Sequence, residues 1–217
     1  WRVEIPHRPG VLILDVEPFA DFLVRMEREN GLPRIVVRER TTGAEHAIDF
    51  AEQAYALGMS NGYFWDSPWL RFDYSSPTTP AQVFDYNMAT RERILRKTQQ
   101  VPSGHDASDY IVERIDAPGE DGALVPVTLL RHRNTPLDGT APVLLYGYGS
   151  YGITIPADFR TGRLSLVDRG FIYAVADVRG SMAKGYQWYL DGKLEKKINT
   201  FTDYVAAGRH LVAKGYT

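Results

Sequence analysis

The stretch Ala141-Pro-Val-Leu-Leu-Tyr-Gly-Tyr-Gly-Ser-Tyr-Gly152 decides the fold. Its apolar run, Val143 to Tyr146, predicts a short buried parallel strand, and the glycines after it predict a tight functional loop. The loop reads Gly147-x-Gly149-x-x-Gly152, which matches the dinucleotide-binding fingerprint. That fingerprint needs a helix that starts at the loop, because the helix N-terminus holds the pyrophosphate. Here Ile153-Thr-Ile-Pro156 follows, and β-branched residues before a proline are a poor helix start, so we expect another role.

The segments around this loop predict a mainly parallel sheet. Gly170-Phe-Ile-Tyr-Ala-Val-Ala-Asp-Val178 is apolar on both faces, as a central strand would be. Residues 111–115 and 125–131 predict paired strands around a turn at Asp121-Gly122. Asp177, at the end of the central strand, could have a functional role, but the expected role is a bond from its carboxylate to loop amides. Strand, loop, strand and helix in this order open a doubly wound α/β domain.

The last segment of the chain predicts a helix. Thr200-Phe-Thr-Asp203 is close to a capping box and is expected to start it, and Gly215 is expected to be its C′ residue. The predicted apolar stripe consists of Phe201, Tyr204, Val205, Leu211 and Val212.

Residues 1–100 predict an all-β unit, either a sandwich or one to two blades of a propeller. Its expected strands include Phe19-Ala-Asp-Phe-Leu-Val24 and the apolar group Gly62-Tyr-Phe-Trp65. Strand, turn and strand recur at a period of about 48 residues, counted between Val36 and Phe84, which suits propeller blades. Residues 101–110 become polar and predict a linker between two domains.

Composition excludes several classes of function. The chain has 217 residues, 44% of them hydrophobic and 24% charged, with a net charge of -2, so it is globular and gives no reason to expect nucleic acid. The absence of cysteine excludes disulfides and thiolate catalysis and fits the cytoplasm. No apolar run approaches the roughly 20 residues of a membrane span, so we expect no membrane partner. No cofactor and no metal site are expected. Because the chain opens on Trp1 rather than methionine, we expect a fragment.

Several motifs in order resemble the prolyl oligopeptidase family of serine peptidases, and its oligopeptidase B branch most closely. They are Val101-Pro-Ser-Gly-His-Asp-Ala-Ser-Asp-Tyr110, the loop at 145–152, Arg163-Leu-Ser-Leu-Val-Asp-Arg-Gly-Phe171, Val178-Arg-Gly180 and the segment from Gly185 to Asp203. Tyr74-Ser-Ser-Pro-Thr-Thr-Pro80 is similar to the end of the family's propeller. The resemblance implies an all-β propeller fragment over 1–100, a linker over 101–110, and over 111–217 the first part of an α/β-hydrolase domain, incomplete before the nucleophile elbow.

The resemblance also implies a site. The family's nucleophile lies in a Gly-x-Ser-x-Gly elbow, and neither Ser103, Ser150 nor Ser181 has that context. We therefore expect the serine, aspartate and histidine of the triad outside this chain, which alone would be inactive. By the same resemblance Tyr148 would donate its hydroxyl to the oxyanion, and Tyr151 and Asp158 would bind substrate.

The implied substrates are short basic peptides, cleaved after arginine or lysine. Pro156 stands where a second acid of the pocket would be, so a preference for paired basic residues is open. Asp158 could equally be a solvated loop carboxylate, and Tyr148 could pack its ring under the loop. Oligomeric state is not predicted.

Two other functions remain open on the sequence. A nucleotide-binding oxidoreductase rests on the glycines at 147–152, with Asp168 as the nearest acid at ribose spacing. A binding or scaffolding protein on the same fold would lack the nucleophile.

Overall fold

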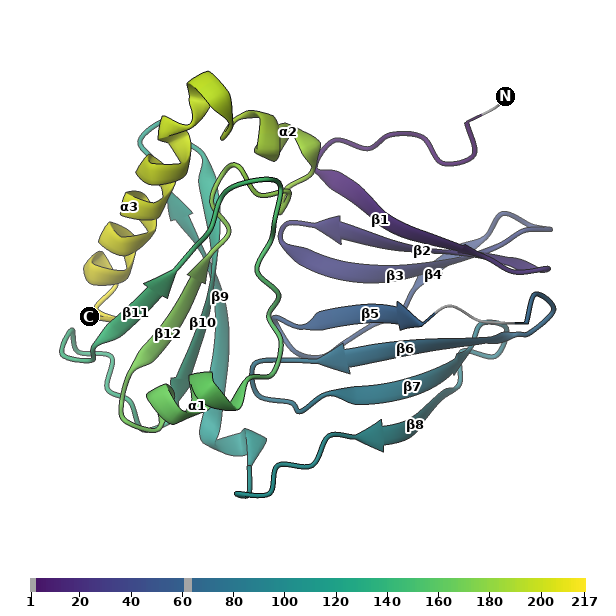
Figure 1. Ribbon diagram of the computed structural model, residues 1–217, viewed down its shortest axis with the longest axis horizontal. Helices are drawn as coiled ribbons and strands as arrows, with labels where there is room; N and C mark the ends of the chain where they lie inside the picture. The colour runs from purple at the N-terminus through teal and green to yellow at the C-terminus, as the bar shows by residue number, and fades with distance from the viewer. Residues whose placement is uncertain (1–2, 61–63) are drawn as a thin grey trace.

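The computed structural model describes residues 3–60 and 64–217, and it has an all-β half and an α/β half (Figure 1). The all-β half holds two four-stranded antiparallel sheets whose strands follow in chain order. The first comprises β1 (Val11–Pro18), β2 (Phe22–Glu29), β3 (Leu32–Glu39) and β4 (Glu45–Ala47). The second comprises β5 (Ala56–Ser60), β6 (Trp69–Ser75), β7 (Gln82–Asn87) and β8 (Arg93–Thr98). This up-and-down order is that of propeller blades, which confirms the predicted fold class of this half.

The two blades pack on each other through one core. Val24, Ile35 and Val37 of the first blade meet Leu70 and Phe72 of the second, all with at most 1% of their surface exposed. The predicted repeat is present, because Val36 lies in β3 and Phe84 in β7, the third strand of each blade.

Two of the strands expected in this half are not observed over their full predicted ranges. The strand predicted over residues 19–24 is confirmed only from Phe22 onward, where β2 begins; residues 19–21 lie in the turn between β1 and β2, which the Phe19 amide closes by donating to the Phe22 carbonyl at 2.8 Å. Of the apolar group predicted as a strand at 62–65, residues 62 and 63 lie outside the described residues, and Phe64 and Trp65 are not in a strand.

The α/β half is built on a sheet of strand order β11-β12-β10-β9. Its strands are β9 (Tyr110–Pro118), β10 (Leu124–His132), β11 (Val143–Tyr146) and β12 (Ile172–Ala176). β9 and β10 form the predicted hairpin, with Gly122 at a φ of 82°. β11 runs parallel to β12 and is joined to it by a crossover that contains α1 (Thr161–Val167), as in the start of a doubly wound domain.

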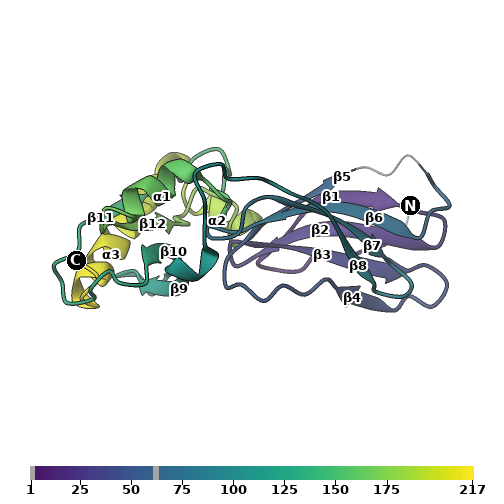
Figure 2. The ribbon, with the colours of Figure 1, turned by 90° about the horizontal axis from the view of Figure 1, so that it is seen from below.

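Helices cover both faces of this sheet (Figure 2). Ala207 and Leu211 of α3 (Ile198–Ala213) pack against Val127 of β10 and Ala174 of β12. On the other face, Leu164 and Val167 of α1 pack against Leu130 and Tyr173. α1 and the short α2 (Tyr186–Leu190) were not predicted. Two 3-10 turns, at Ala107–Asp109 and Leu194–Lys196, complete the described elements.

The side chains predicted to be buried in β11 and α3 are largely not the ones that are buried. β11 lies at the edge of the sheet, because no described strand pairs with its outer side, and Leu144 and Tyr146, which share one of its faces, are 37% and 41% exposed. Helix α3 begins at Ile198, and its buried residues are Thr200, Asp203, Ala207 and Leu211. Of the predicted stripe only Leu211 is buried.

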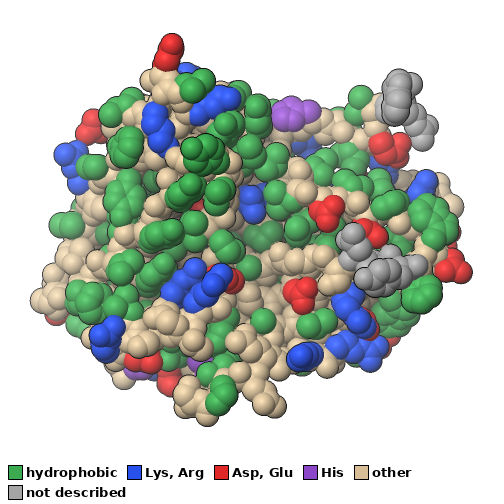
Figure 3. Space-filling view, in the orientation of Figure 1, with side chains coloured by type: hydrophobic (Ala, Val, Ile, Leu, Met, Phe, Trp, Pro, Cys, Tyr) green, Lys and Arg blue, Asp and Glu red, His purple; other side chains and the backbone are tan. Residues whose placement is uncertain are grey.

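The other four residues of the predicted stripe, Phe201, Tyr204, Val205 and Val212, are exposed. Hydrophobic side chains gather over this half of the molecule (Figure 3). In the described part of the chain, no helix combines the length and the apolar character needed to cross a membrane.

The turn between β2 and β3 joins the two halves. The Gly31 amide donates to the Ala183 carbonyl at 2.7 Å, and Arg114 donates to the Asn30 carbonyl. A Cβ atom at Gly31, whose φ is 78°, would lie 2.5 Å from the Arg114 guanidinium and from the Asp177 carboxylate, so a side chain there would displace both groups. Asp177 does not bond to loop amides as predicted. Its side chain is buried, and its Oδ2 lies 3.8 Å from Nη2 of Arg114. Burial raises the pKa of the Asp177 carboxyl to about 7.

Candidate active site

The glycine–tyrosine loop follows the carboxyl end of β11. Gly149, Gly152 and Tyr151 all have left-handed backbone angles, with φ of 64°, 72° and 54°. From residue 153 to 160 the chain forms no helix, and α1 begins only at Thr161. The loop therefore lacks the helix N-terminus that a pyrophosphate site requires, as the β-branched residues and proline at 153–156 predicted.

Glycine is required in this loop by close backbone packing. A Cβ atom at Gly149 would overlap the Thr200 methyl group and the Val178 side chain. A Cβ atom at Gly180 would overlap the Gly149 carbonyl. The Gly152 amide also donates to the Gly180 carbonyl at 3.0 Å, so the loop is fixed against the segment that follows β12.

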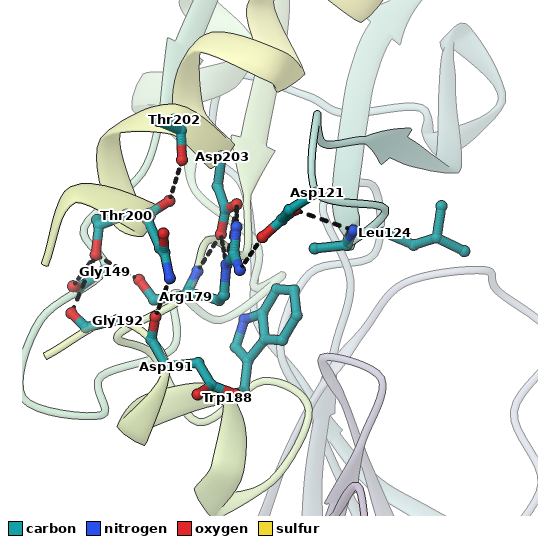
Figure 4. Close-up of polar contacts among 12 residues, drawn as sticks. Asp121, Leu124, Gly149, Arg179, Trp188, Asp191, Gly192, Thr200, Thr202 and Asp203 are labelled. Carbon is teal, nitrogen blue, oxygen red and sulfur yellow. Dashed lines mark hydrogen bonds and ion pairs between the residues drawn. The ribbon is translucent and has the colours of Figure 1, made fainter. Parts of the chain in front are cut away.

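A buried ion pair supports that segment (Figure 4). The Arg179 guanidinium donates to the Asp203 carboxylate through Nε at 2.9 Å and Nη2 at 2.5 Å, and the Arg179 amide donates to it at 2.9 Å. The second Arg179 amino group donates to Asp121 at 2.5 Å, and the Trp188 ring lies 5.8 Å from the guanidinium carbon. Asp203 is fully buried, and its hydrogen bonds raise the pKa of Arg179 above the usual value. The pair ties α3 to the end of β12.

The first turn of α3 holds the loop directly. The Thr200 hydroxyl donates to the Arg179 carbonyl at 2.7 Å and lies 3.3 Å from the Gly149 carbonyl. The Lys197 ammonium donates to the Gly149 carbonyl and to the Ser150 hydroxyl, the latter at 2.7 Å. The sequence reasoning missed these roles of Lys197, Thr200 and Arg179.

One pattern could have revealed the buried pair. Asp203, Ala207 and Leu211 are spaced by four residues and therefore lie on one helix face. A carboxylate on a buried face needs a charged partner, so this spacing predicts a buried cation next to Asp203.

The structure places Tyr148 and Tyr151 at the surface of this loop. Tyr148 is 43% exposed, and its hydroxyl has no hydrogen-bond partner among the described residues. Tyr151 is 82% exposed and lines a hollow of about 320 Å³ together with Lys193 and Leu194. A positive φ is strained for a bulky side chain, and Tyr151 shares this feature with Leu194, whose φ is 48°. Both tyrosine side chains are free to contact a ligand.

Asp158 is engaged within its own segment. Its carboxylate accepts from Arg160 Nε at 2.8 Å and from Arg163 Nη1 at 2.9 Å. Arg163 also lies over the Tyr173 ring, whereas Arg160 is largely exposed. The negative charge that was expected to bind substrate is thus paired with two arginines in this structure.

The described residues hold no serine–histidine pair. Ser150 bonds to Lys197, and the Ser181 hydroxyl donates to the Val178 carbonyl at 2.8 Å. The His46 ring lies 2.9 Å from the Tyr86 hydroxyl. No cluster of three or more potential metal ligands occurs in the part of the chain that the structure describes.

Comparison with known proteins identifies the family. Residues 1–99 match the model of the prolyl oligopeptidase N-terminal beta-propeller domain, and residues 157–217 match that of the prolyl oligopeptidase family. The chain belongs to the prolyl oligopeptidase family. The resemblance read from the sequence motifs is confirmed, and so is the pairing of propeller blades with the start of the family's hydrolase domain.

Individual members of the prolyl oligopeptidase family match over nearly all of the chain. Dipeptidyl aminopeptidase BI of Pseudoxanthomonas mexicana is 42% identical over 100% of the chain and 30% of its own length. Protease 2 of Moraxella lacunata is 36% identical over 94% of the chain and 29% of its own length. Oligopeptidase B from Trypanosoma brucei, solved with covalently bound antipain, superposes with a TM-score of 0.89 at 36% identity, over 97% of the chain and 31% of that structure. The chain thus spans about 30% of the length of the curated relatives that it matches.

Proposed function

We propose that these 217 residues are part of a serine oligopeptidase, an endopeptidase that cleaves short peptides after arginine or lysine. One observation carries the proposal: the loop after β11 exposes Tyr148 with an unpartnered hydroxyl while a buried ion pair fixes the backbone behind it. The triad serine, histidine and aspartate would come from outside these residues, so this chain alone would be inactive. The lack of cysteine supports a cytoplasmic location for the enzyme.

Tyr148 would act by stabilising the transition state of acyl transfer. When the serine attacks the scissile carbonyl, negative charge develops on the carbonyl oxygen. A hydroxyl that is already aimed at that oxygen stabilises the charge without rearrangement and is worth about 2.7–4 kcal/mol. The glycines on either side of Tyr148 would let the substrate backbone come close.

Asp158 and Tyr151 would contribute to substrate binding. A basic side chain next to the scissile residue would take the place of Arg160 at the Asp158 carboxylate, since Arg160 is 62% exposed and can move into solvent. Arg163 would stay, so the gain from this exchange would be small. We therefore expect Asp158→Asn to raise KM for a dibasic peptide by about threefold and to leave a monobasic peptide unchanged, as steady-state kinetics would measure.

The function is tested with a polypeptide of the relatives' length that carries these residues. Hydrolysis of an arginyl-amide reporter is measured for the unmodified protein and for Tyr148→Phe, which removes only the hydroxyl. We expect kcat to fall by about 10²–10³ with KM nearly constant. Tyr186→Phe is the matched control, because Tyr186 is 50% exposed in α2 and lines a hollow with Val11 and Leu12 of β1 rather than with the loop.

Substrates distinguish the kind of peptidase. A reporter with a blocked amino end is expected to be cleaved as well as one with a free amino end, because the proposal is an endopeptidase. Cleavage of the free form alone would favour the removal of dipeptides that the name dipeptidyl aminopeptidase implies for one relative. Full kcat in Tyr148→Phe would refute the oxyanion role.

A further inference from the structure

Helix α3 is preceded by a lysine at a position that disfavours a positive charge. Lys197 is the N-cap residue of α3, and a helix N-terminus carries a partial positive charge of its own. Burial also lowers the pKa of the Lys197 ammonium. Its hydrogen-bond partners among the described residues are all neutral oxygens, so no carboxylate offsets the charge. Helix stability does not account for this lysine.

The contacts of Lys197 account for it. An ammonium has three donors, and here each has an acceptor: the Gly149 carbonyl, the Ser150 hydroxyl at 2.7 Å and the Thr200 hydroxyl at 3.2 Å. Two of the three acceptors belong to the glycine–tyrosine loop. The side chain therefore spans from the start of α3 to the loop after β11.

The neighbouring lysines make no such contact. Lys196 donates to the Asp191 carboxylate at 2.7 Å and is 60% exposed. Lys193 lies 4.7 Å from the Tyr189 ring centroid. Among these lysines, then, the described hydrogen bonds to the loop come from Lys197.

The peptide that Lys197 holds is next to Tyr148. The Gly149 carbonyl lies one residue after Tyr148, and glycines flank Tyr148 on both sides, so the backbone there has wide freedom unless it is held. The Tyr148 hydroxyl has no partner of its own in the described chain, so its direction depends on the backbone. Fixing the Gly149–Ser150 segment therefore fixes the backbone from which the Tyr148 side chain projects.

We propose that Lys197 is a positioning residue, whose ammonium holds the Gly149–Ser150 segment so that the Tyr148 hydroxyl stays aimed at the reacting carbonyl oxygen. The proposal rests on the oxyanion role proposed above for Tyr148. A donor stabilises a transition state fully only if it is fixed before the reaction, and small displacements can cost about 10²-fold in rate. Lys197 would supply that fixation without touching the substrate.

A double-mutant cycle on the relatives' full length of chain tests this role. Lys197→Met is expected to lower kcat by about tenfold or more and to change KM by less than about twofold. Inhibition by a peptide aldehyde, which mimics the tetrahedral intermediate, should weaken in the same proportion as kcat falls. In the Tyr148→Phe background, Lys197→Met should add less than about a threefold loss, because the hydroxyl it positions is gone. Lys196→Met is the matched control and should keep kcat within about twofold.

Two results would overturn the proposal: an unchanged kcat in Lys197→Met, or the same loss in kcat with and without the Tyr148 hydroxyl. Thermal unfolding of each variant separates these results from misfolding. If Lys197→Met does not fold, Lys197→Gln, which keeps one donor group, takes its place in the same cycle. Full kcat in Tyr148→Phe would instead refute the oxyanion role, and the Lys197 proposal would fall with it.

Discussion

Substitution of Asp203 by asparagine tests the buried ion pair that supports the candidate active site. The carboxylate accepts from three nitrogen atoms of Arg179, namely Nε and Nη2 of the guanidinium and the backbone amide. Asparagine keeps the shape and one acceptor, but its amino group must face a donor of Arg179, and the buried guanidinium loses its full counter-charge. Asp121 remains as a second partner, although its side chain is half exposed.

Removing one member of a buried pair costs about 3–5 kcal/mol, and the retained Asp121 contact places Asp203→Asn near the lower value, about 3 kcal/mol. For a chain of this size that loss corresponds to a fall of about 6–12 °C in Tm. Urea and thermal unfolding would measure it.

The matched control for Asp203→Asn is Glu120→Gln, on the other ion pair of helix α3. Arg209 of α3 donates to Glu120 at 3.0 Å, but these side chains are 72% and 87% exposed. Exposed pairs of this kind often contribute nothing measurable, so we expect no change in stability. If Asp203→Asn lost no more stability than Glu120→Gln, the buried pair would not be what holds α3 to the end of β12.

Two further substitutions test the packing of the loop and the junction between the halves. Gly149→Ala should lower the free energy of unfolding by about 2 kcal/mol or more, because its methyl group would overlap Thr200 at a strained φ of 64°. In the same urea titration Gly162→Ala, in α1 with open space around it, should gain about 0.5–1 kcal/mol, and equal losses at both positions would contradict the reasoning. The pKa of Asp177 is raised from 3.8 to about 7, so the folded state binds its proton more tightly than the unfolded state does. That stabilisation is complete below about pH 4 and is lost as the pH rises through about 7. The wild type should therefore lose stability relative to Asp177→Asn between about pH 4 and 7, and parallel stability curves over that range would show that Asp177 does not titrate there.

Local sequence patterns were enough to predict the strands that carry the fold. Alternation over residues 69–74 predicts that Leu70, Phe72 and Tyr74 face one side, and all three are buried in the core between the blades. The unbroken apolar run at 170–178 predicts a strand covered on both faces, which β12 is. These features depend on neighbours along the chain, and periodicity records them.

The polar contacts of the candidate site depend on residues far apart in sequence, so periodicity could not record them. Helical spacing predicts that α3 has two faces, but only its neighbours decide which face is covered. The apolar face with Phe201 and Val205 remains exposed. Thr200 and Asp203 face the sheet instead, because both form hydrogen bonds with Arg179 at the end of β12. The resemblance to a family named Tyr148, Tyr151 and Asp158 from motifs alone. It did not reveal that two arginines already bind Asp158, and the substrate contacts of all three residues stay predictions.

The meeting of three glycine backbones limits how this loop can be engineered or can evolve. A side chain at Gly149 or Gly180 would overlap the other segment or its supports, and one at Gly192 would overlap the backbone of residues 179–180. The Thr200 hydroxyl lies within hydrogen-bonding distance of all three segments. A loop transplanted from a relative should therefore function only if the segments around 149, 180 and 192 are exchanged as one cassette. Libraries that randomise the loop alone would consist mostly of chains in which the segments around 149, 180 and 192 cannot pack together.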